Sequence, residues 1–370
     1  MQVMATSRSR GQQIAVALLI AVTLLLASAL LAGTSTSTSS ASAISTSSAS
    51  AARAAAPGSH PASHAKTRYA RIRHACRRPT PKHPECLALG RVTVAPGTVG
   101  ARPFVQNDGA TESGPAGGLT PAQLASAYEY DPAEGGAGQT VALVDAYDDP
   151  NIEKDLATFD TNYGLPACTS ANGCFTKVSQ TGSTTSLPKA DKEGWSVEIT
   201  LDVESAHAVC ESCKILLVEA NESTNAALAT AVDEAATLGA TEISNSYGGI
   251  EEAGEEAAYN HPGVVITASA GDEGYYGWDE LNKNKSLPLP EKLAIPAALP
   301  TVVAVGGTSL YLNENGTRNS ETVWNNNGPG DEVGLREKAA MGATGGGCST
   351  LFTSQPWQQD IPPARVEAKT

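Results

Sequence analysis

The stretch Gly194-Trp-Ser-Val-Glu-Ile-Thr-Leu-Asp-Val-Glu204 carries the most information about the fold and chemistry of this chain. It reads as a helix in which Glu198 and Asp202 are four residues apart, so both carboxyl groups lie on one face within contact distance. Like charges in a sheltered site repel each other, and one carboxyl group then keeps its proton to an unusually high pH. Such a pair suits acid–base chemistry in acid solution, and a solvated acidic helix face is the alternative interpretation.

The N-terminal segment predicts export. Two arginines precede an apolar run over residues 14–26, and small residues at 27–29 offer a cleavage site. We therefore predict a signal peptide over residues 1–33, and an extracellular, monomeric mature protein. A membrane anchor is the alternative if this segment is not cleaved, because the apolar run extends to Ala32. Residues 34–66 are mostly Ser, Thr and Ala, which is typical of a disordered low-complexity linker.

Charge divides the chain sharply. Residues 51–102 carry ten Lys and Arg and one acid, whereas residues 103–370 carry thirteen Lys and Arg and thirty-eight Asp and Glu. An acidic exported domain suits an acidic medium, where protonated carboxyl groups no longer repel one another, and it does not favour nucleic-acid binding. The segment 67–117 is a basic, cysteine-containing arm. It either docks on the acidic domain, docks on an anionic cell surface, or is simply solvated.

The seven cysteines are expected to form disulfides, because exported proteins fold in an oxidising compartment. Short spacings favour the pairs Cys76–Cys86 and Cys168–Cys174. The Cys210-x-x-Cys213 motif is interpreted as a third disulfide, with a redox pair or half a zinc site as alternatives, because neither a second CxxC nor a nearby His pair completes a metal site. Cys348 is then left without a local partner.

From Gly118 onwards, buried strands alternate with helices. Thr120 followed by Pro121 marks a helix start, since Thr caps helices and Pro suits their first turn. Continuous apolar strands predict a parallel sheet covered on both faces, and therefore an α/β fold. The predicted strands are residues 139–145, 214–219, 241–246, 263–269 and 301–305, and the predicted helices are residues 119–128, 151–163, 194–204 and 225–238.

Seven segments, in their order and spacing, resemble the sedolisins, which are serine-carboxyl peptidases that share the subtilisin fold. The resemblance covers about residues 118–360. It implies a subtilisin-like, doubly wound α/β domain with a mostly parallel sheet over residues 118–370, and an acid endopeptidase acting on a protein or peptide substrate. The segments are VALVDAYDDP (141–150), GWSVEITLDVE (194–204), ISNSYGG (243–249), ITASAGDEG (266–274), TVVAVGGTSL (301–310), ETVWN (321–325) and GGGCS…PWQ (345–358).

The resemblance also implies roles for individual residues. Glu198 is the general base, and Asp202 is the acid that orients it and shares its protons. Asp272 is the oxyanion-hole acid, which must be protonated in order to donate a hydrogen bond to the developing oxyanion. A turn-capping Asp is the alternative for Asp272. Asp145 corresponds to a Glu that extends the carboxyl network in some sedolisins, and Tyr247 stands where those proteins have Trp. Both Asp145 and Tyr247, like Asp272, follow predicted strands, and sites in such sheets lie at the carboxyl ends of strands.

The histidines do not favour a Ser-His-Asp enzyme. His207 lies five residues after Asp202, which turns it away from the carboxyl face of the helix. His261 precedes a proline at a strand entry, and the sequence holds no G-x-S-x-G elbow.

The chain departs from the sedolisin pattern at the nucleophile. In the family a Gly-Thr-Ser-Ala-like turn follows the PWQ segment, and here the sequence ends at Thr370. Within residues 118–370 the one Gly-Thr-Ser run ends at Ser309, and the alternating residues and Asn315-Gly316 turn after it predict a hairpin. Ser349 is interpreted as structural.

We therefore expect the nucleophile, the family's C-terminal calcium site, which would lie beyond Thr370, and the long pro-domain to be missing from residues 1–370, and we expect no cofactor. The leading hypothesis is a partial sedolisin that is inactive alone. A non-catalytic peptide-binding pseudo-peptidase is the second hypothesis. The third is a peptidase that uses another nucleophile such as Ser309, or that is completed by a second chain.

Overall fold

The computed structural model describes residues 67–77, 79–96, 102–105, 118–275, 294–313, 315–324, 343–347, 349 and 351–358. The predicted signal peptide and linker, residues 1–66, lie outside them. The helices are α2 (Pro121–Tyr128), α3 (Ile152–Tyr163), α4 (Trp195–Val209) and α5 (Asn225–Thr237), with the 3-10 turns η1 (Glu256–Tyr259) and η3 (Pro356–Gln358).

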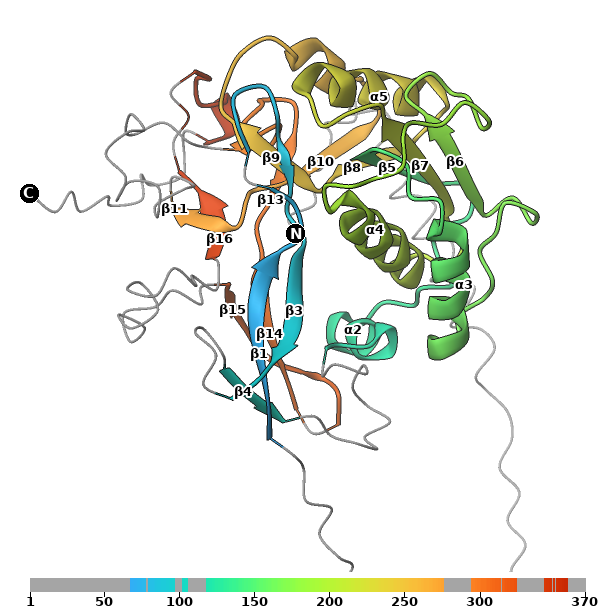
Figure 1. Ribbon diagram of the computed structural model, residues 1–370, viewed down its shortest axis with the longest axis vertical. Helices are drawn as coiled ribbons and strands as arrows, with labels where there is room; N and C mark the ends of the chain where they lie inside the picture. The colour runs from blue at the N-terminus through green and yellow to red at the C-terminus, as the bar shows by residue number, and fades with distance from the viewer. Residues whose placement is uncertain are drawn as a thin grey trace, which may run out of the picture. The chain divides into compact units, whose positions relative to one another are not determined.

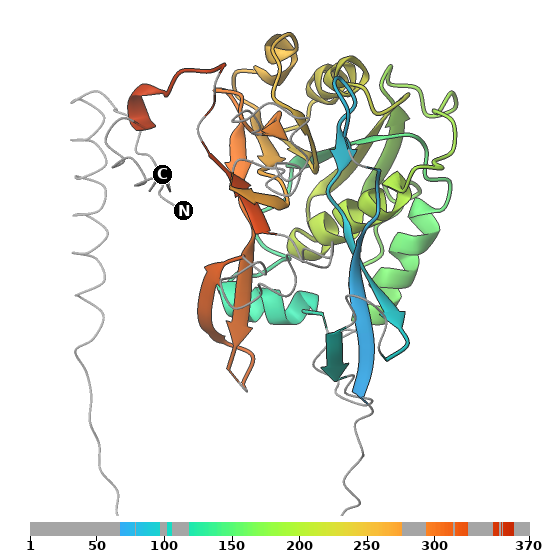
Figure 2. The same cartoon turned by 60° about the vertical axis from the view of Figure 1, so that its left-hand side comes forward.

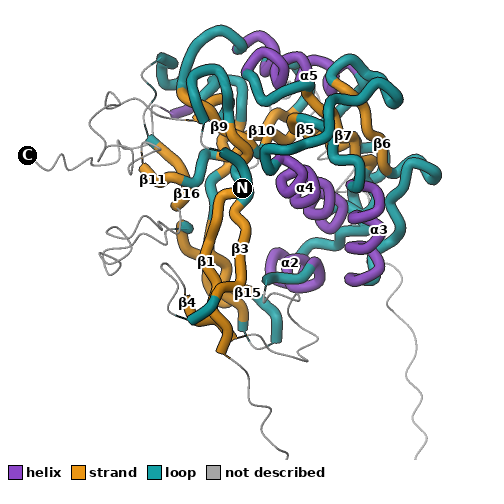
Figure 3. The backbone as a smooth tube through the Cα atoms, viewed as in Figure 1, coloured by secondary structure: helices purple, strands orange, loops and turns teal. Residues whose placement is uncertain are grey.

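The strands lie between and around these helices, as Figures 1 and 3 show. In chain order they are β1 (Thr67–His74), β2 (Glu85–Cys86), β3 (Leu89–Val94), β4 (Arg102–Val105), β5 (Thr140–Ala146), β6 (Phe175–Ser179), β7 (Lys214–Ala220), β8 (Glu242–Asn245), β9 (Tyr247–Ile250), β10 (Val265–Ser269), β11 (Glu273–Tyr275), β12 (Ala294–Ile295), β13 (Val303–Val305), β14 (Thr308–Leu312), β15 (Arg318–Val323) and β16 (Ala343–Gly346).

A six-stranded sheet forms the centre of the domain, in the order β13-β10-β8-β5-β7-β6. Every neighbouring pair of its strands is parallel. This confirms the α/β fold with a parallel sheet that the apolar runs predicted. The strand β6 at one edge was not predicted, because its five residues Phe-Thr-Lys-Val-Ser show no continuous apolar run.

Alternation along β5 and β7 separates two hydrophobic cores. Leu143 and Leu217 belong to the core that α3 and α4 cover, whereas Val144 belongs to the core that α5 covers. Figure 1 shows α5 on one side of the sheet and α3 with α4 on the other. Side chains two residues apart in a strand share a face. Asp145 and Glu219 therefore face α4, at the carboxyl ends of two adjacent strands.

Local signals in the sequence explain how α2 begins. The Thr120 hydroxyl oxygen accepts a hydrogen bond from the Gln123 amide at 3.2 Å, and the Gln123 side-chain oxygen accepts one from the Thr120 amide at 2.9 Å. Pro121 occupies the first turn. This reciprocal capping satisfies two amides that no turn of the helix can reach, and it confirms the predicted helix start.

The described part of the basic arm is folded and packs on the domain. Strands β3, β1 and β4 form a small antiparallel sheet, and β2 adds to the edge of β9. Cys76, Cys86 and Ala88 are buried in the same core as Trp195 and Tyr247. Figure 2 shows the blue arm strand crossing in front of α4. Of the three interpretations of the arm, docking on the acidic domain is the one seen.

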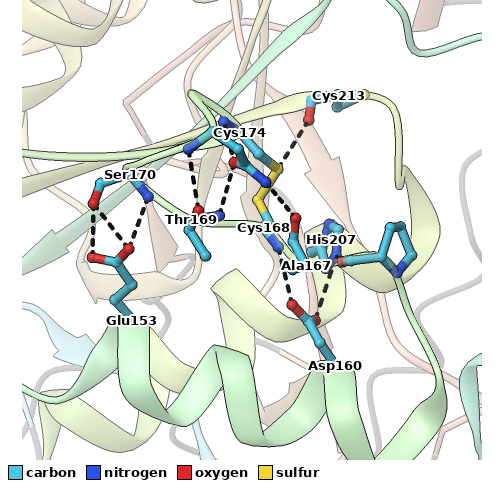
Figure 4. Close-up of a disulfide and its surroundings, with 11 residues drawn as sticks. Glu153, Asp160, Ala167, Cys168, Thr169, Ser170, Cys174, His207 and Cys213 are labelled. Carbon is cyan, nitrogen blue, oxygen red and sulfur yellow. Dashed lines mark hydrogen bonds and ion pairs between the residues drawn. A yellow bond between two sulfur atoms is a disulfide. The ribbon is translucent and has the colours of Figure 1, made fainter.

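Three disulfides join Cys76 to Cys86, Cys168 to Cys174 and Cys210 to Cys213, as the spacings predicted. Figure 4 shows the second one beside His207. Although His207 and the sulfurs of that disulfide lie within 4.8 Å of one another, the sulfurs are bonded to each other. The group is therefore a disulfide beside a histidine.

The buried His207 points away from Glu198, as its position in the helix predicted. Its Nε2 lies 2.9 Å from the carbonyl oxygen of Pro166 and 3.4 Å from Oδ1 of Asp160. Asp160 also accepts a hydrogen bond from the Cys168 amide at 3.1 Å, so it ties the start of the disulfide loop to α3 (Figure 4). His261 lies elsewhere, with Nε2 3.0 Å from a carboxylate oxygen of Asp233.

The two serines that the sequence offered as substitutes for a nucleophile have structural roles. Ser309 lies in β14, opposite Thr322 of β15, which confirms the predicted hairpin. The Ser349 hydroxyl oxygen accepts hydrogen bonds from the amides of Leu351 at 3.1 Å and Phe352 at 2.8 Å. Ser349 therefore caps a turn, which is the kind of structural role that the sequence suggested.

No helix among the described residues has the length and apolar character needed to span a membrane.

We expect a single free thiol per chain. Six of the seven cysteines are bonded in local pairs, and Cys348 lies outside the described residues. Titration of the oxidised protein with a thiol reagent in a non-reducing denaturant should therefore give one thiol. A count of zero free thiols in a monomeric protein would contradict this assignment, in which three local disulfides leave Cys348 free.

Candidate active site

Glu198 and Asp202 lie one turn apart on the face of α4 that is directed at the sheet. Glu198 is 2% exposed. One of its carboxylate oxygens, Oε2, is buried and has no hydrogen-bond partner among the described residues, and the same holds for Oδ2 of Asp202. The Ser246 hydroxyl donates a hydrogen bond to Oδ1 of Asp202 at 2.8 Å. Glu198 is thus buried and Asp202 is half-buried, with Asp202 held from the segment between β8 and β9.

Asp145 joins this pair from the end of β5. Its side chain is fully buried, and neither carboxylate oxygen has a hydrogen-bond partner in the described part of the chain. Burial raises the pKa of Asp145 well above its ordinary value, and the charges of Asp202 and Glu219 raise it further. Since a buried unpartnered charge is costly, Asp145 is stable there in its protonated form.

Glu219 is a fourth carboxyl group of the same cluster. It pairs with Asp145 across β5 and β7. Burial raises its pKa to about 8, although the charge of Lys177, 3.7 Å away, and a hydrogen bond from the Asp149 amide at 3.0 Å act in the opposite direction. Glu219 therefore links the cluster to a charged rim formed by Lys177 and its partner Asp148.

The cluster holds protons at pH values where ordinary carboxyl groups have lost them. Burial raises the pKa of Asp202 from 3.8 to about 7, against the lowering effect of its hydrogen bond from Ser246. Burial also raises the pKa of Glu198 well above its ordinary value, and the charges of Asp202 and Asp145 add to the effect. Four acids that cannot all ionise together share protons among them, which is the property that acid–base chemistry requires.

Asp272 lies at the border of the cluster, in the bend between β10 and β11. Its charge contributes to the raised pKa of Glu198, which places the two carboxyl groups within electrostatic range. The residue is partly exposed, and its carbonyl oxygen accepts a hydrogen bond from the Ala343 amide at 2.9 Å. Gly271 before it has a φ of 102°, which glycine adopts without strain and which turns the chain at this point.

Tyr247 forms a wall rather than a member of the carboxyl cluster. Its hydroxyl donates to the side-chain oxygen of Asn245 at 2.8 Å and lies 2.9 Å from the Tyr259 hydroxyl. Its ring centroid is 6.1 Å from that of Trp195, the first residue of α4. Burial, followed by the neighbouring Tyr259, raises the pKa of Tyr247. The aromatic pair fixes the start of α4 against β9.

The structure brings together more than the sequence predicted. Glu198, Asp202 and Asp145 share one buried cluster, with Asp272 at its border and Tyr247 behind it. Three contributors were missed: Glu219, Ser246 and the amide of Ala88, which donates to the Glu198 carboxylate. The first two had a signal in the sequence. Glu219 ends an apolar strand in the same way as Asp145, and Ser246 lies within the quoted ISNSYGG segment.

We expect the cluster to destabilise the fold as pH rises. The folded pKa of Asp202 is about 7 and its ordinary value is 3.8, so the folded state binds more protons than the unfolded state between these values. Stability therefore falls as pH rises from about 4 to about 7, by on the order of 3 kcal/mol for a shift of this size. Glu198→Gln removes one charge and keeps the shape, so this variant should lose less stability over the same interval.

Urea unfolding at a series of pH values checks this prediction. The matched control is Glu134→Gln, since Glu134 is exposed and lies in a loop far from the cluster in sequence. The control should follow the parent at every pH. If Glu198→Gln also follows the parent while unfolding cooperatively, the two acids of α4 form an ordinary solvated face.

Comparisons with known proteins agree with the fold. The sequence pattern of the Subtilase family matches residues 189–356. Sedolisin from Pseudomonas sp. (strain 101) is 29% identical over 266 residues, which are 67% of this chain and 42% of that protein. Kumamolisin from Bacillus sp. (strain MN-32) is 28% identical over 263 residues, which are 66% of this chain and 42% of that protein. The chain thus spans less than half the length of the curated relatives it matches.

A solved structure supports the same relationship. Pseudomonas sedolisin, a serine-carboxyl proteinase in complex with two molecules of pseudo-iodotyrostatin, matches with a TM-score of 0.52 and 27% identity, over 65% of each chain. The parallel sheet, its covering helices and the order of the seven segments are therefore those of a subtilisin-like fold. Over residues 189–356 the chain matches the Subtilase family, and over about two thirds of its length it is similar to sedolisin and kumamolisin.

Proposed function

We propose that this chain supplies the acid–base and oxyanion groups of an exported serine-carboxyl endopeptidase that hydrolyses peptide bonds in acid solution. The observation that carries the proposal is the buried cluster of Glu198, Asp202 and Asp145, whose pKa values are raised by burial and by one another. A solvated helix face would not retain protons in this way. Substrates are proteins or peptides, as the match to a peptidase family suggests.

Glu198 acts as the general base in this proposal. It accepts the proton of a seryl hydroxyl during attack on the peptide carbonyl and then returns it to the leaving amine. Its Oε2, buried and without a partner among the described residues, is free to accept such a proton. Asp202 takes up part of the negative charge and, held by Ser246, keeps the carboxyl group of Glu198 oriented.

Asp272 donates the hydrogen bond to the developing oxyanion. Only a protonated carboxyl group has a hydrogen to donate, so this role confines activity to acid solution. Its place at the border of the cluster, within electrostatic range of Glu198, suits a group that faces the same peptide carbonyl. Asp145 extends the shared-proton network inward, away from the substrate.

A second candidate function is peptide binding without hydrolysis. Ser246 gives its hydrogen bond to Asp202, and Ser309 is fixed in a hairpin, so no described serine is hydrogen-bonded to Glu198. The resemblance places the nucleophile turn after the PWQ segment, and no serine of residues 1–370 is assigned that role. We propose accordingly that residues 1–370 alone do not hydrolyse peptides.

The test compares two proteins in hydrolysis of a denatured protein substrate between pH 3 and 8. One is the 370-residue chain, and the other is this chain extended at Thr370 with the segment of Pseudomonas sedolisin that follows the aligned region. We expect hydrolysis in acid solution by the extended chain only. Glu198→Gln should lower its kcat/KM about a thousandfold or more, and Asp272→Asn about a hundredfold.

The control Glu134→Gln in the extended chain should retain the parent activity. An extended chain that melts cooperatively and binds peptides without cleaving them would favour the second candidate function. Acid hydrolysis by the 370-residue chain that Ser309→Ala or Ser246→Ala abolishes would show instead that the chain contains its own nucleophile.

A further inference from the structure

The edge of β9, next to the carboxyl cluster, is occupied by the chain itself. Strand β2, Glu85–Cys86, is added there in the antiparallel direction, with Cys86 opposite Tyr247. The Leu87 amide donates to the Ser246 carbonyl oxygen at 3.2 Å. The opposite edge of β9 is taken by β12. Addition of an extended segment to a free strand edge is a recurrent way in which proteins bind peptides.

This added strand leads directly to Glu198. The next amide along the chain, that of Ala88, donates to the Glu198 carboxylate. The peptide bond between Leu87 and Ala88 therefore lies against the group that we propose as the general base. Ala88 is 2% exposed, and a Cβ placed on Gly248 would lie 3.6 Å from Leu87. The edge thus fits an extended peptide with a large aliphatic residue followed by a small one.

Further close contacts hold this segment in place. The Lys82 carbonyl oxygen accepts a hydrogen bond from the Asn225 amide at 3.0 Å. At the start of α4, a Cβ on Gly194 would lie 2.0 Å from the Ala75 carbonyl oxygen. Gly194 also has a φ of 102°, so both the space and the backbone require glycine there. The fit between the arm and α4 is therefore as tight as the fit within the domain.

Residues of the same arm help to line a cavity of about 520 Å³. Lys82 and His83 of the arm line it, together with Tyr247, Tyr259 and the acids Glu252 and Glu255 of the domain. The arm thus brings basic side chains to a cavity whose domain residues include two acids.

A disulfide closes the loop that carries these contacts. Cys86 of the added strand is bonded to Cys76, which follows β1, at a sequence separation of 10. Cys86 is 1% exposed and Cys76 is 8% exposed. Because β1 is itself paired with β3 and β4, the bond ties the added strand to a folded unit on the same chain. Such a cross-link restricts the conformations of the loop and so favours the arrangement in which the added strand lies at the edge.

We propose that residues 82–88 are an internal peptide ligand of the β9 edge and that the Cys76–Cys86 disulfide is the latch that keeps the edge closed to external peptides. A dithiol opens the latch by transferring two electrons and two protons to the disulfide. Two cysteine thiols form, and the dithiol becomes a disulfide. The interpretation of this edge as the groove that binds the substrate rests on the proposed function. The occupation of the edge by residues 82–88, and their release on reduction of the disulfide, do not.

The test uses the full 370-residue chain and the labelled peptide Lys-His-Pro-Glu-Ser-Leu-Ala-Leu-Gly, which copies residues 82–90 with Ser in place of Cys. Binding is measured by fluorescence anisotropy under non-reducing conditions. The variant Cys76→Ser/Cys86→Ser should bind the peptide at least about tenfold more tightly than the parent, because the competing segment loses the cross-link that orders it for the edge. The matched control Cys210→Ser/Cys213→Ser should bind like the parent.

Two further measurements complete the test. Treatment of the parent with dithiothreitol should produce the same gain in binding, and treatment of the Cys76→Ser/Cys86→Ser variant should add nothing. Hydrogen exchange of the Leu87 amide should accelerate in the open forms, since that amide loses its partner. Leu87→Pro, which removes the amide while leaving the disulfide, should also raise peptide binding, and Leu87→Ala, which keeps the amide, should not.

The outcomes separate this proposal from the proposed function. Unchanged peptide binding with unchanged protection of the Leu87 amide in the disulfide variant would overturn the latch. Faster exchange of that amide without any peptide binding would overturn the β9 edge as a peptide site. The gain in peptide binding is measured in the 370-residue chain and needs no hydrolysis, so a failed hydrolysis test leaves the latch standing.

Discussion

Burial of carboxyl groups beneath α4 is the constraint on which the rest of this structure depends. Transferring a charged carboxylate out of water costs several kcal/mol unless partners compensate. Here Asp145 has no hydrogen-bond partner among the described residues, and Glu198 and Asp202 each leave one oxygen without one. The protein therefore retains protons rather than charges at this place, and it tolerates lower stability near neutral pH. Such an arrangement has no structural advantage over apolar packing, which is why it points to chemistry.

The parallel sheet makes the burial possible. Asp145 and Glu219 follow Leu143 and Leu217 by two residues, so they inherit the face that packs against α4 and come at the ends of adjacent strands. The apolar residues before them anchor each strand, and every fully buried Leu contributes about 1.5–3 kcal/mol. Burial of the core thus offsets the stability that the carboxyl cluster costs. Each of the two strands carries both a core leucine and a carboxyl group of the cluster.

The sequence was sufficient where the signal is local. Apolar runs predicted five of the six strands of the sheet, the i, i+4 spacing predicted that Glu198 and Asp202 share a face, and short separations predicted the three disulfides. It was insufficient where the partner is distant. Strand β9, Tyr-Gly-Gly-Ile, has no apolar alternation of its own and is defined by β12 and β2 on its two sides. The hydrogen bond from the Ala88 amide to Glu198 joins residues far apart in sequence. The count of charges in the basic arm did not predict where the arm lies.

Three different partners pack against three parts of α4. Ile199 and Val203 pack into the core with α3, Glu198 and Asp202 face the carboxyl ends of the strands, and the first turn lies under the arm. Gly194 permits the closest of these approaches. A change at any of these positions alters the packing of the helix against one of its neighbours, whereas the face that carries Val197, Leu201 and Val209 is exposed. Access to the peptide edge, orientation of the proposed base and packing of the core are consequently coupled through one rigid element, and separating them experimentally requires substitutions on the arm rather than on the helix.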